Sequence, residues 1–319
     1  MHTLVLGATG FVGGQIARAA VERGWPVRGL RRRAGATGAI GDLDVEWFDG
    51  DLADADTLRA AIAGCEVVFH AAGYYPWVSR NIGKAVRVAT AQIRTVLSAA
   101  RDAGVARLAY TGTLTTIGPP SEPGRLADER DFYLPGSVDS SYFECKWAME
   151  AECYRAAAGG FPVVVLLPTV VFGPGDVKPT TGRLIVMLAQ GRLPLSVDVP
   201  VNVVDGRDVA AAHLAAAEWG RVGERYIVGG HNTTVAEVAA LTARLAGRRP
   251  PRPLSAGLVN AVFNAADALR VPMVETVRTL RYLQPLDSRK ARRDLALRPR
   301  PLEDTLRDTM AWFRQNGYL

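Results

Sequence analysis

The stretch LVLGATGFVGGQI, from Leu4 to Ile16, decides the fold, because three glycines follow a short apolar run at intervals of three residues. The apolar run predicts a strand, and Gly13 to Arg23 predicts an amphipathic helix. Strand, glycine turn and helix is the order of a phosphate-binding turn. Gly7 permits the tight turn, Gly10 lets the backbone approach a pyrophosphate, and Gly13 lets the helix pack closely on the strand. The alternative is an ordinary turn between a strand and a helix.

The first half of the chain continues this alternation of strands and helices. Several of the strands are almost continuously apolar, which predicts a parallel sheet covered on both faces. We expect strands at Thr3–Leu6, Val27–Arg31, Val45–Phe48, Glu66–His70, Arg107–Thr111 and Pro162–Leu167, and helices at Gly13–Arg23, Thr57–Ala63, Ile82–Ala103 and Ser140–Ala158.

The pattern changes after Pro168. We expect a loop at Gly173–Gly182, a helix at Val209–Trp219, a strand at Arg225–Val228, a helix opened by a capping box of Thr234 and Glu237, and a mostly helical remainder ending with Leu302–Arg314. The prediction is an α/β, doubly wound Rossmann sheet with a smaller C-terminal domain. We expect residues 1–170 to form the cofactor-binding domain, to which 200–228 return, and residues 171–199 and 229–319 to form the substrate-binding region.

Composition excludes several other classes of protein. The chain has 319 residues, 48% hydrophobic and 22% charged, as globular proteins do. No apolar run reaches the roughly 18 residues of a membrane span, and strand-like sequence begins at Thr3, so we expect a cytoplasmic protein. The three cysteines and four histidines show no metal-ligand spacing, so no metal is expected. The net charge of +6 is spread along the chain, which favours a solvated surface over a nucleic-acid partner.

Residues after the second and third strands indicate which nicotinamide cofactor the chain binds. The second strand ends in Arg31, Arg32 and Arg33, where a cofactor with a free ribose 2′-hydroxyl usually meets an acidic residue. Arginines suit a 2′-phosphate, so NADP is favoured and NAD stays possible. The alternative is a solvated basic turn. Asp51 is placed to bond an adenine amino group while Leu52 packs on the ring; otherwise Asp51 is a capping residue.

Two other strand ends and one helix supply candidates for chemistry. Small residues at Ala71, Ala72 and Gly73 leave room for a cofactor against the sheet edge. The motif SSYFECK places Tyr142 and Lys146 four residues apart on one helical face. A nearby ammonium favours the phenolate of a tyrosine, which makes the pair a candidate proton-transfer unit. The alternative is an amphipathic helix in which the two are only neighbours.

A hydroxyl at the end of the fifth strand, on Thr111 or Thr113, would complete such a unit. Ligands of an open parallel sheet bind outside the carboxyl ends of its strands. A hydroxyl there would orient a substrate oxygen toward Tyr142.

Together these motifs resemble the extended short-chain dehydrogenase/reductase family, of the NAD-dependent epimerase/dehydratase type. The resemblance covers essentially the whole chain, and it is nearest to the dihydroflavonol-reductase-like branch and the hopanoid-associated sugar epimerases. FGPGDVKPTTGRLIV and GERYIVGGHNTT carry that nearer resemblance.

The resemblance implies a role for each matching residue. Thr113, rather than Thr111, polarises the substrate, Tyr142 is the acid–base, and Lys146 binds the nicotinamide ribose and lowers the tyrosine pKa. Arg32 takes the place of the arginine that reads a 2′-phosphate. The cofactor site implied comprises Gly7, Thr9, Gly10, Phe11, Val12, Gly13, Arg31, Arg32, Asp51, Leu52, Ala71, Ala72, Gly73, Tyr142, Lys146, Pro168, Val170 and Val171. The family also pairs the helices Ile82–Ala103 and Ser140–Ala158 across a two-fold axis, so we expect a homodimer.

The chain departs from the family pattern at four places. Thr113 stands where serine is usual; its hydroxyl serves, but its methyl group crowds the site. Leu6 replaces a usual threonine, and ATAQIRT, from Ala89 to Thr95, replaces a motif with two asparagines and a glycine. Nucleotide-sugar epimerases tend to carry Tyr-Phe-Asn where this chain has Leu167, Pro168 and Thr169, which argues against a nucleotide-sugar substrate.

The substrate wall is predicted from GYYPWV, which places Tyr74, Tyr75 and Trp77 after the fourth strand. With Thr113 and Lys178 they are the candidate substrate contacts, and aromatic rings favour an apolar or aromatic ketone or secondary alcohol. The leading prediction is an NADP-dependent reductase or dehydrogenase. The alternatives are a nucleotide-sugar or hopanoid-linked sugar epimerase or dehydratase with retained cofactor, and a non-catalytic NADP-sensing protein.

Overall fold

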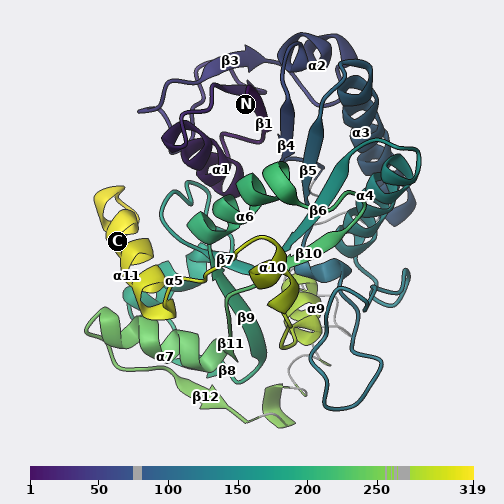
Figure 1. Cartoon of the computed structure of the whole chain (residues 1–319). Coiled ribbons are helices and arrows are strands. Elements are labelled where there is room, and N and C mark those ends of the chain that lie inside the picture. The colour runs from purple at the N-terminus through teal and green to yellow at the C-terminus, as the bar shows by residue number, and fades with distance from the viewer. Residues whose placement is uncertain (75–80, 256, 260, 262–263, 265–273) are drawn as a thin grey trace.

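The centre of the molecule is a seven-stranded parallel sheet with the strand order β10-β6-β5-β4-β1-β2-β3 (Figure 1). The computed structural model describes residues 1–74, 81–255, 257–259, 261, 264 and 274–319. The strands are β1 (Thr3–Leu6), β2 (Val27–Arg31), β3 (Glu46–Asp49), β4 (Val67–His70), β5 (Arg107–Thr111), β6 (Val163–Pro168) and β10 (Arg225–Val228).

Helices cover both faces of this sheet (Figure 1). Alternate residues of β1 explain the two cores, since Leu4 and Leu6 pack on one side and Val5 on the other. One face carries α2 (Ala55–Ile62), α3 (Ile82–Asp102) and α4 (Ser141–Ala158), and the other carries α1 (Phe11–Glu22) and α6 (Gly206–Trp219). The predicted α/β Rossmann class is confirmed.

Helix starts differ from the sequence predictions by a few residues, for local reasons. Helix α1 begins at Phe11 instead of Gly13, because Gly10 already serves as its N-cap. Helix α2 begins at Ala55 because the Asp54 carboxylate accepts hydrogen bonds from the amides of Asp56 and Thr57.

A smaller part of the chain builds a second core beyond the C-terminal edge of the main sheet (Figure 1). A three-stranded sheet is formed by β7 (Val170–Phe172), β9 (Pro200–Asp205) and β11 (His231–Thr234), and a two-stranded one by β8 (Leu195–Val197) and β12 (Arg252–Leu254). The helices of this core are α5 (Gly182–Ala189), α7 (Val235–Leu245) and α11 (Leu302–Gln315), and α9 (Val274–Tyr282) lies in the same part of the chain. Helix α10 (Arg289–Asp294) instead packs through Ala291 into the core on the α1 and α6 face of the main sheet. A short 3₁₀ turn, η1 (Leu114–Thr116), follows β5.

The capping box predicted for α7 is confirmed, since the Thr234 hydroxyl and the Glu237 carboxylate each bond the other's backbone amide. Strand β12 was not predicted, because its three residues form a strand only by pairing with the distant β8. In the segment 200–228, α6 packs on α1 and β10 pairs with β6, whereas β9 pairs with β7 and β11.

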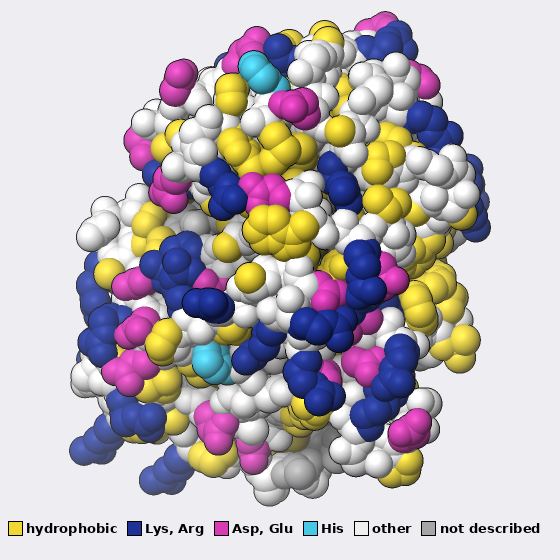
Figure 2. Space-filling model, viewed as in Figure 1, with side chains coloured by type: hydrophobic (Ala, Val, Ile, Leu, Met, Phe, Trp, Pro, Cys, Tyr) yellow, Lys and Arg dark blue, Asp and Glu magenta, His cyan; other side chains and the backbone are white. Residues whose placement is uncertain are grey.

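Charged side chains are distributed in pairs over the surface. On the face seen in Figure 2, Lys and Arg side chains lie next to Asp and Glu side chains instead of forming one continuous basic area. In α10 the cations are locally paired, with Lys290 2.5 Å from Glu224 and Arg293 2.6 Å from Asp294. Among the described residues, no helix is long and apolar enough to cross a membrane, and no metal-binding group of histidine, cysteine or acidic residues is found.

Candidate active site

The glycine turn has the geometry that its sequence predicts. Gly7 has a φ of 93°, and a Cβ there would lie 2.6 Å from the carbonyl oxygen of Ala71, which directly follows β4. A Cβ on Gly13 would lie 2.1 Å from the Gly7 carbonyl oxygen. Each position therefore excludes any side chain, and helix α1 is pressed directly on the end of β1.

Gly10 leaves the start of α1 open to an anion. It is the N-cap of the helix and offers no side-chain acceptor to the first-turn amides of Phe11, Val12 and Gly13. A Cβ at Gly10 would approach only the Gly7 carbonyl, at 3.3 Å, so the outer side of the turn is free of other atoms. A pyrophosphate fits this turn, because free amides and the helix dipole both favour an anion.

The loop after β2 folds back over the glycine turn. A Cβ at Gly38 would lie 2.5 Å from the Thr9 carbonyl oxygen, and Arg18 of α1 pairs with Asp42 at 2.8 Å. Asp42 is the first acidic residue after the arginine cluster, and its carboxylate is paired with Arg18.

The three arginines differ in their surroundings. Arg31 bonds Asp49 at 2.6 Å and stacks on Trp47. Arg32 and Arg33 are exposed, and their side chains make no hydrogen bond or ion pair with any described residue. Of the two cofactor candidates, Arg31 is paired with Asp49 of β3, and Arg32 is the one whose guanidinium has no partner among the described residues.

The other predicted cofactor residues line the same edge of the sheet. Asp51 is half-buried and accepts a hydrogen bond from the Ala53 amide, while Leu52 packs against the core. Ala71, Ala72 and Gly73 follow β4 directly. Pro168 ends β6, and Val170 and Val171 begin β7.

The predicted catalytic groups converge at the start of α4. Ser140 caps the helix, which places Tyr142 in its first turn. The Tyr142 hydroxyl donates a long hydrogen bond of 3.5 Å to the Thr113 hydroxyl, which follows β5. Lys146 lies one turn further along α4, and burial lowers its pKa to about 8. A phenol, a hydroxyl and a cation therefore share one edge of the sheet.

The two threonines at the end of β5 face different layers. The Thr111 hydroxyl is 2.8 Å from His213 Nε2 of α6, and His213 Nδ1 is 2.8 Å from the Val209 carbonyl oxygen. A neutral imidazole has one N–H, so Nδ1 donates to Val209 and Nε2 accepts from Thr111. Thr111 is thus a partner of α6, and Thr113 alone faces Tyr142.

Aromatic rings hold the first turn of α4 in place. The Phe143 ring lies 4.8 Å from Tyr282 and 5.7 Å from Tyr133, centroid to centroid. The Tyr133 hydroxyl donates to Glu144 at 2.5 Å. Sequence reasoning missed this cluster, because its members are separated by up to 149 residues and become neighbours only in the fold.

The segment that departs from the family motif is packed with apolar atoms. Ala89 and Ile93 of α3 are fully buried, and the Thr95 hydroxyl bonds back to the Ala91 carbonyl oxygen of its own helix. Helix α3 is therefore held against the sheet by close packing of small and aliphatic side chains in this segment.

The predicted substrate residues are only partly placed. Tyr74 is half-buried and packs against the core. Tyr75 and Trp77 lie outside the described residues. Lys178 is exposed on the loop before α5, whose Gly175 approaches Gln15 of α1, and no described contact joins Lys178 to Tyr142.

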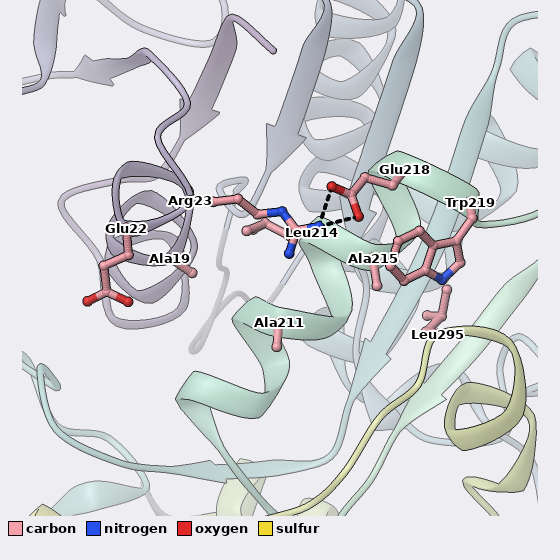
Figure 3. A pocket seen from close by; sticks show the side chains of 9 residues that line it. All are labelled: Ala19, Glu22, Arg23, Ala211, Leu214, Ala215, Glu218, Trp219 and Leu295. Carbon is pink, nitrogen blue, oxygen red and sulfur yellow. Dashed lines mark hydrogen bonds and ion pairs between the residues drawn. The ribbon is translucent and has the colours of Figure 1, made fainter.

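A shallow groove between α1 and α6 is separate from this constellation (Figure 3). Arg23 and Glu218 pair across it at 2.6 Å, and Trp219 lies at its rim, half-exposed. Its lining contains none of the predicted catalytic or cofactor residues, because it opens on the helix face opposite α4.

Comparison with known proteins agrees with the geometry. The model of the NAD dependent epimerase/dehydratase family matches residues 3–229. A putative dihydroflavonol 4-reductase from Synechocystis sp. is 31% identical, spanning 99% of this chain and 95% of that protein. Sterol demethylase protein B from Methylococcus capsulatus is also 31% identical, over 100% of both chains.

A solved structure is similar over its full length as well. The crystal structure of a nucleoside-diphosphate-sugar epimerase from Pseudomonas aeruginosa superposes with a TM-score of 0.85 at 32% identity, covering 100% of this chain and 99% of that one. The chain therefore belongs to the NAD dependent epimerase/dehydratase family, of the extended short-chain dehydrogenase/reductase type.

Proposed function

We propose that this protein is an NADP-dependent reductase or dehydrogenase that interconverts a ketone and a secondary alcohol on a largely apolar substrate. The observation that carries the proposal is the meeting of Thr113, Tyr142 and Lys146 at one edge of the sheet. Relatives named as reductases, such as the putative dihydroflavonol 4-reductase, support reduction of a carbonyl group as the reaction.

The proposed roles follow from the chemistry of each side chain. The bound nicotinamide cofactor supplies the hydride. Tyr142 gives its phenolic proton to the carbonyl oxygen, and the Thr113 hydroxyl donates a hydrogen bond to the same oxygen. The Lys146 ammonium favours the phenolate that remains, and the α4 N-terminus adds its partial positive charge.

Preference for NADP rests on the free guanidinium of Arg32 and on the engaged carboxylates nearby. Asp42 pairs with Arg18, and Asp49 pairs with Arg31, so neither is available to a ribose 2′-hydroxyl. A 2′-phosphate would instead find Arg32 unpaired.

The test is NADPH oxidation at the nicotinamide absorbance with a panel of ketones, including sterol-like and aromatic ones. Tyr142→Phe should reduce turnover at least about 100-fold and leave cofactor affinity nearly unchanged, because the ring still packs. Lys146→Ala should reduce both. Tyr154→Phe, three turns further along α4, is the matched control and should keep its activity. If Tyr142→Phe keeps most of the activity, the acid–base assignment is wrong.

The second candidate is an epimerase that oxidises and re-reduces a sugar on a retained cofactor. The full-length similarity to a nucleoside-diphosphate-sugar epimerase favours it. Net cofactor turnover separates the two, because an epimerase leaves the nicotinamide absorbance unchanged over complete cycles. Turnover of nucleotide sugars without NADPH consumption, together with cofactor that survives purification, would replace the reductase proposal.

We also infer a homodimer formed through α3 and α4. Small side chains, Ala148 and Ala151 on α4 and Ala91 on α3, stand on the outer side of this pair of helices and are not fully buried. Such positions let helices of two subunits approach closely. Light scattering at micromolar concentration should give twice the chain mass, and Ala151→Arg should give a monomer. A monomeric wild-type protein would refute the inference.

A further inference from the structure

The face of α4 that carries Tyr142 and Lys146 continues with a third group at the same spacing. Glu150 lies four residues beyond Lys146, so the three side chains form one stripe along the helix. Glu150 is fully buried, with 0% of its surface exposed. A buried carboxylate is costly unless it is paired, so its partners matter.

The two oxygens of Glu150 have different surroundings. Oε1 accepts hydrogen bonds from Arg225 of β10 at 3.1 Å and from the Tyr154 hydroxyl at 2.5 Å. Oε2 accepts none of good geometry from the described residues, and it lies 3.5 Å from where a Cβ would stand on Gly112. Gly112 immediately precedes Thr113, so the uncompensated oxygen faces the strand end that carries the site.

Arg225 counters the effect of burial on Glu150. Burial raises the pKa of Glu150, and the Arg225 guanidinium opposes that rise. A guanidinium stays charged in proteins, and at hydrogen-bonding distance it favours the carboxylate form of its partner. Because β10 is the edge strand and β6 lies between it and β5, Arg225 approaches Glu150 from the side away from the catalytic groups.

The other ionisable groups near Lys146 add little charge. His70 of β4 is neutral, since burial and the Lys146 charge lower its pKa to about 3. Burial raises the pKa of Tyr110 of β5 and of Cys145 of α4, so both are neutral as well. The buried residues that α3 presents are apolar: Ala85, Ala89, Ile93, Val96, Leu97, Ala99 and Ala100. Glu150 is therefore the one described anion on this face close to the Lys146 ammonium.

We propose that Glu150 is a positioning residue that keeps Lys146 protonated at neutral pH, held in place and charged by Arg225. The proposal rests on the proposed roles of Tyr142 and Lys146. Burial works in the opposite direction, because it lowers the pKa of Lys146 to about 8, and Cys145 and Glu150 oppose that fall. Without the carboxylate, Lys146 would be largely neutral at pH 7 and would no longer favour the Tyr142 phenolate.

Coulomb's law gives the size of the effect. Side chains four residues apart on a helix are about 6 Å apart, and at an effective dielectric constant of about 20 a unit charge there shifts a pKa by about two units. Glu150→Gln removes this charge and leaves Arg225 unpaired, so the Lys146 midpoint should fall by at least about one pH unit. Replacing both Glu150 and Arg225 by Met removes opposing charges together, and the midpoint should fall by about half a unit.

The experiment reads the charge of Lys146 directly, without a substrate. The whole protein is acetylated with acetic anhydride at a series of pH values, and labelling of Lys146 is followed by peptide mass spectrometry. The exposed Lys84 and Lys178 serve as internal references, since only four lysines compete. In wild type the Lys146 midpoint should lie near pH 8, and in Glu150→Gln it should move to lower pH while both references stay in place.

Controls separate a charge effect from damage to the fold. Tyr154→Phe removes a hydrogen bond from the same carboxylate but no charge, and it should leave the midpoint unchanged. If Glu150→Gln does not fold, the double Met variant remains, because apolar side chains of similar volume often replace a buried ion pair without loss of stability. An unmoved Lys146 midpoint in a folded variant overturns the proposal. Failure of the proposed function appears separately, as turnover that survives Tyr142→Phe.

Discussion

Replacing Thr111 and Thr113 by valine, one at a time, separates stability from chemistry at the end of β5. Valine keeps the branched shape of threonine and removes only the hydroxyl. The Thr111 hydroxyl is the donor to His213 Nε2, at 2.8 Å in a buried contact between sheet and α6. The Thr113 hydroxyl meets Tyr142 at 3.5 Å on the side of α4.

The two variants should differ in which quantity they change. Thr111→Val leaves a buried acceptor without its donor, which costs about 1–3 kcal/mol of unfolding free energy. Thr113→Val loses two long hydrogen bonds of 3.5 Å, from the Thr115 amide and from the Tyr142 hydroxyl, which together are worth about 1 kcal/mol or less. It removes, however, a donor to the reacting oxygen, and such a loss lowers turnover by about 100-fold.

Urea unfolding and NADPH oxidation measure the two quantities on the same protein samples. Thr111→Val should unfold at lower urea and keep turnover per folded molecule, and Thr113→Val should show the opposite pattern. Thr113→Ser restores the hydroxyl and should restore turnover. If Thr111→Val stops catalysis while Thr113→Val does not, the catalytic hydroxyl has been assigned to the wrong residue.

Three further variants or conditions test other parts of the structure. Gly13→Ala should weaken NADPH binding or prevent folding, because its Cβ would lie 2.1 Å from a backbone oxygen; unchanged affinity by titration would contradict the packing of α1. Arg32→Ala should reduce affinity for NADPH but not for NADH. Arg31→Ala is the control and should reduce stability without changing the preference for NADPH, because Arg31 pairs with Asp49. Equal affinities of the wild-type protein for NADPH and NADH would refute the predicted NADP preference. Burial lowers the pKa of His213 to about 4 and that of His70 to about 3, below the usual 6.5. The unfolded chain therefore binds more protons than the folded one at acidic pH. As the pH falls below about 6.5, each imidazole lowers the free energy of unfolding by about 1.4 kcal/mol per pH unit. In urea unfolding at pH 7 and pH 5, His70→Phe should lose less stability than wild type, and an equal loss would show that His70 does not titrate in this way.

Local patterns in the sequence were enough to predict the main sheet. Strands of continuous apolar residues, such as β4 and β6, can only be stable in a sheet covered on both faces, and the glycine turn fixed where the first helix meets it. The strands β7, β8, β9, β11 and β12 were not predicted. They pair only with one another, so each forms only when a partner from another part of the chain is present.

The site was predictable where it depends on spacing and not where it depends on partners. Tyr142 and Lys146 were found from their separation of four, and continuing that count would have reached Glu150. Nothing in the sequence indicated that Arg225, a charged residue in a short strand, would be its counter-ion, because that contact joins residues 75 positions apart. Likewise, only the fold shows that Arg31 is held by Asp49 and leaves the free guanidinium to Arg32.

The end of β5 separates two kinds of contact within three residues, because Thr111 is the last residue of the strand and Thr113 lies beyond it, where the alternation of the strand no longer applies. Ala109 and Thr111 point to the layer of α1 and α6, whereas Tyr110 and Gly112 point to the layer of α4. A Cβ on Gly112 would lie 3.5 Å from Oε2 of Glu150, so this carboxylate lies at van der Waals distance from the strand end. The same Cβ would lie only 2.6 Å from the Leu167 side chain, so a larger residue at 112 requires Leu167 to move. The Thr113 hydroxyl and, beside Gly112, the Glu150 carboxylate therefore both lie on the α4 side of this strand end, next to the residues to which we assign proton transfer.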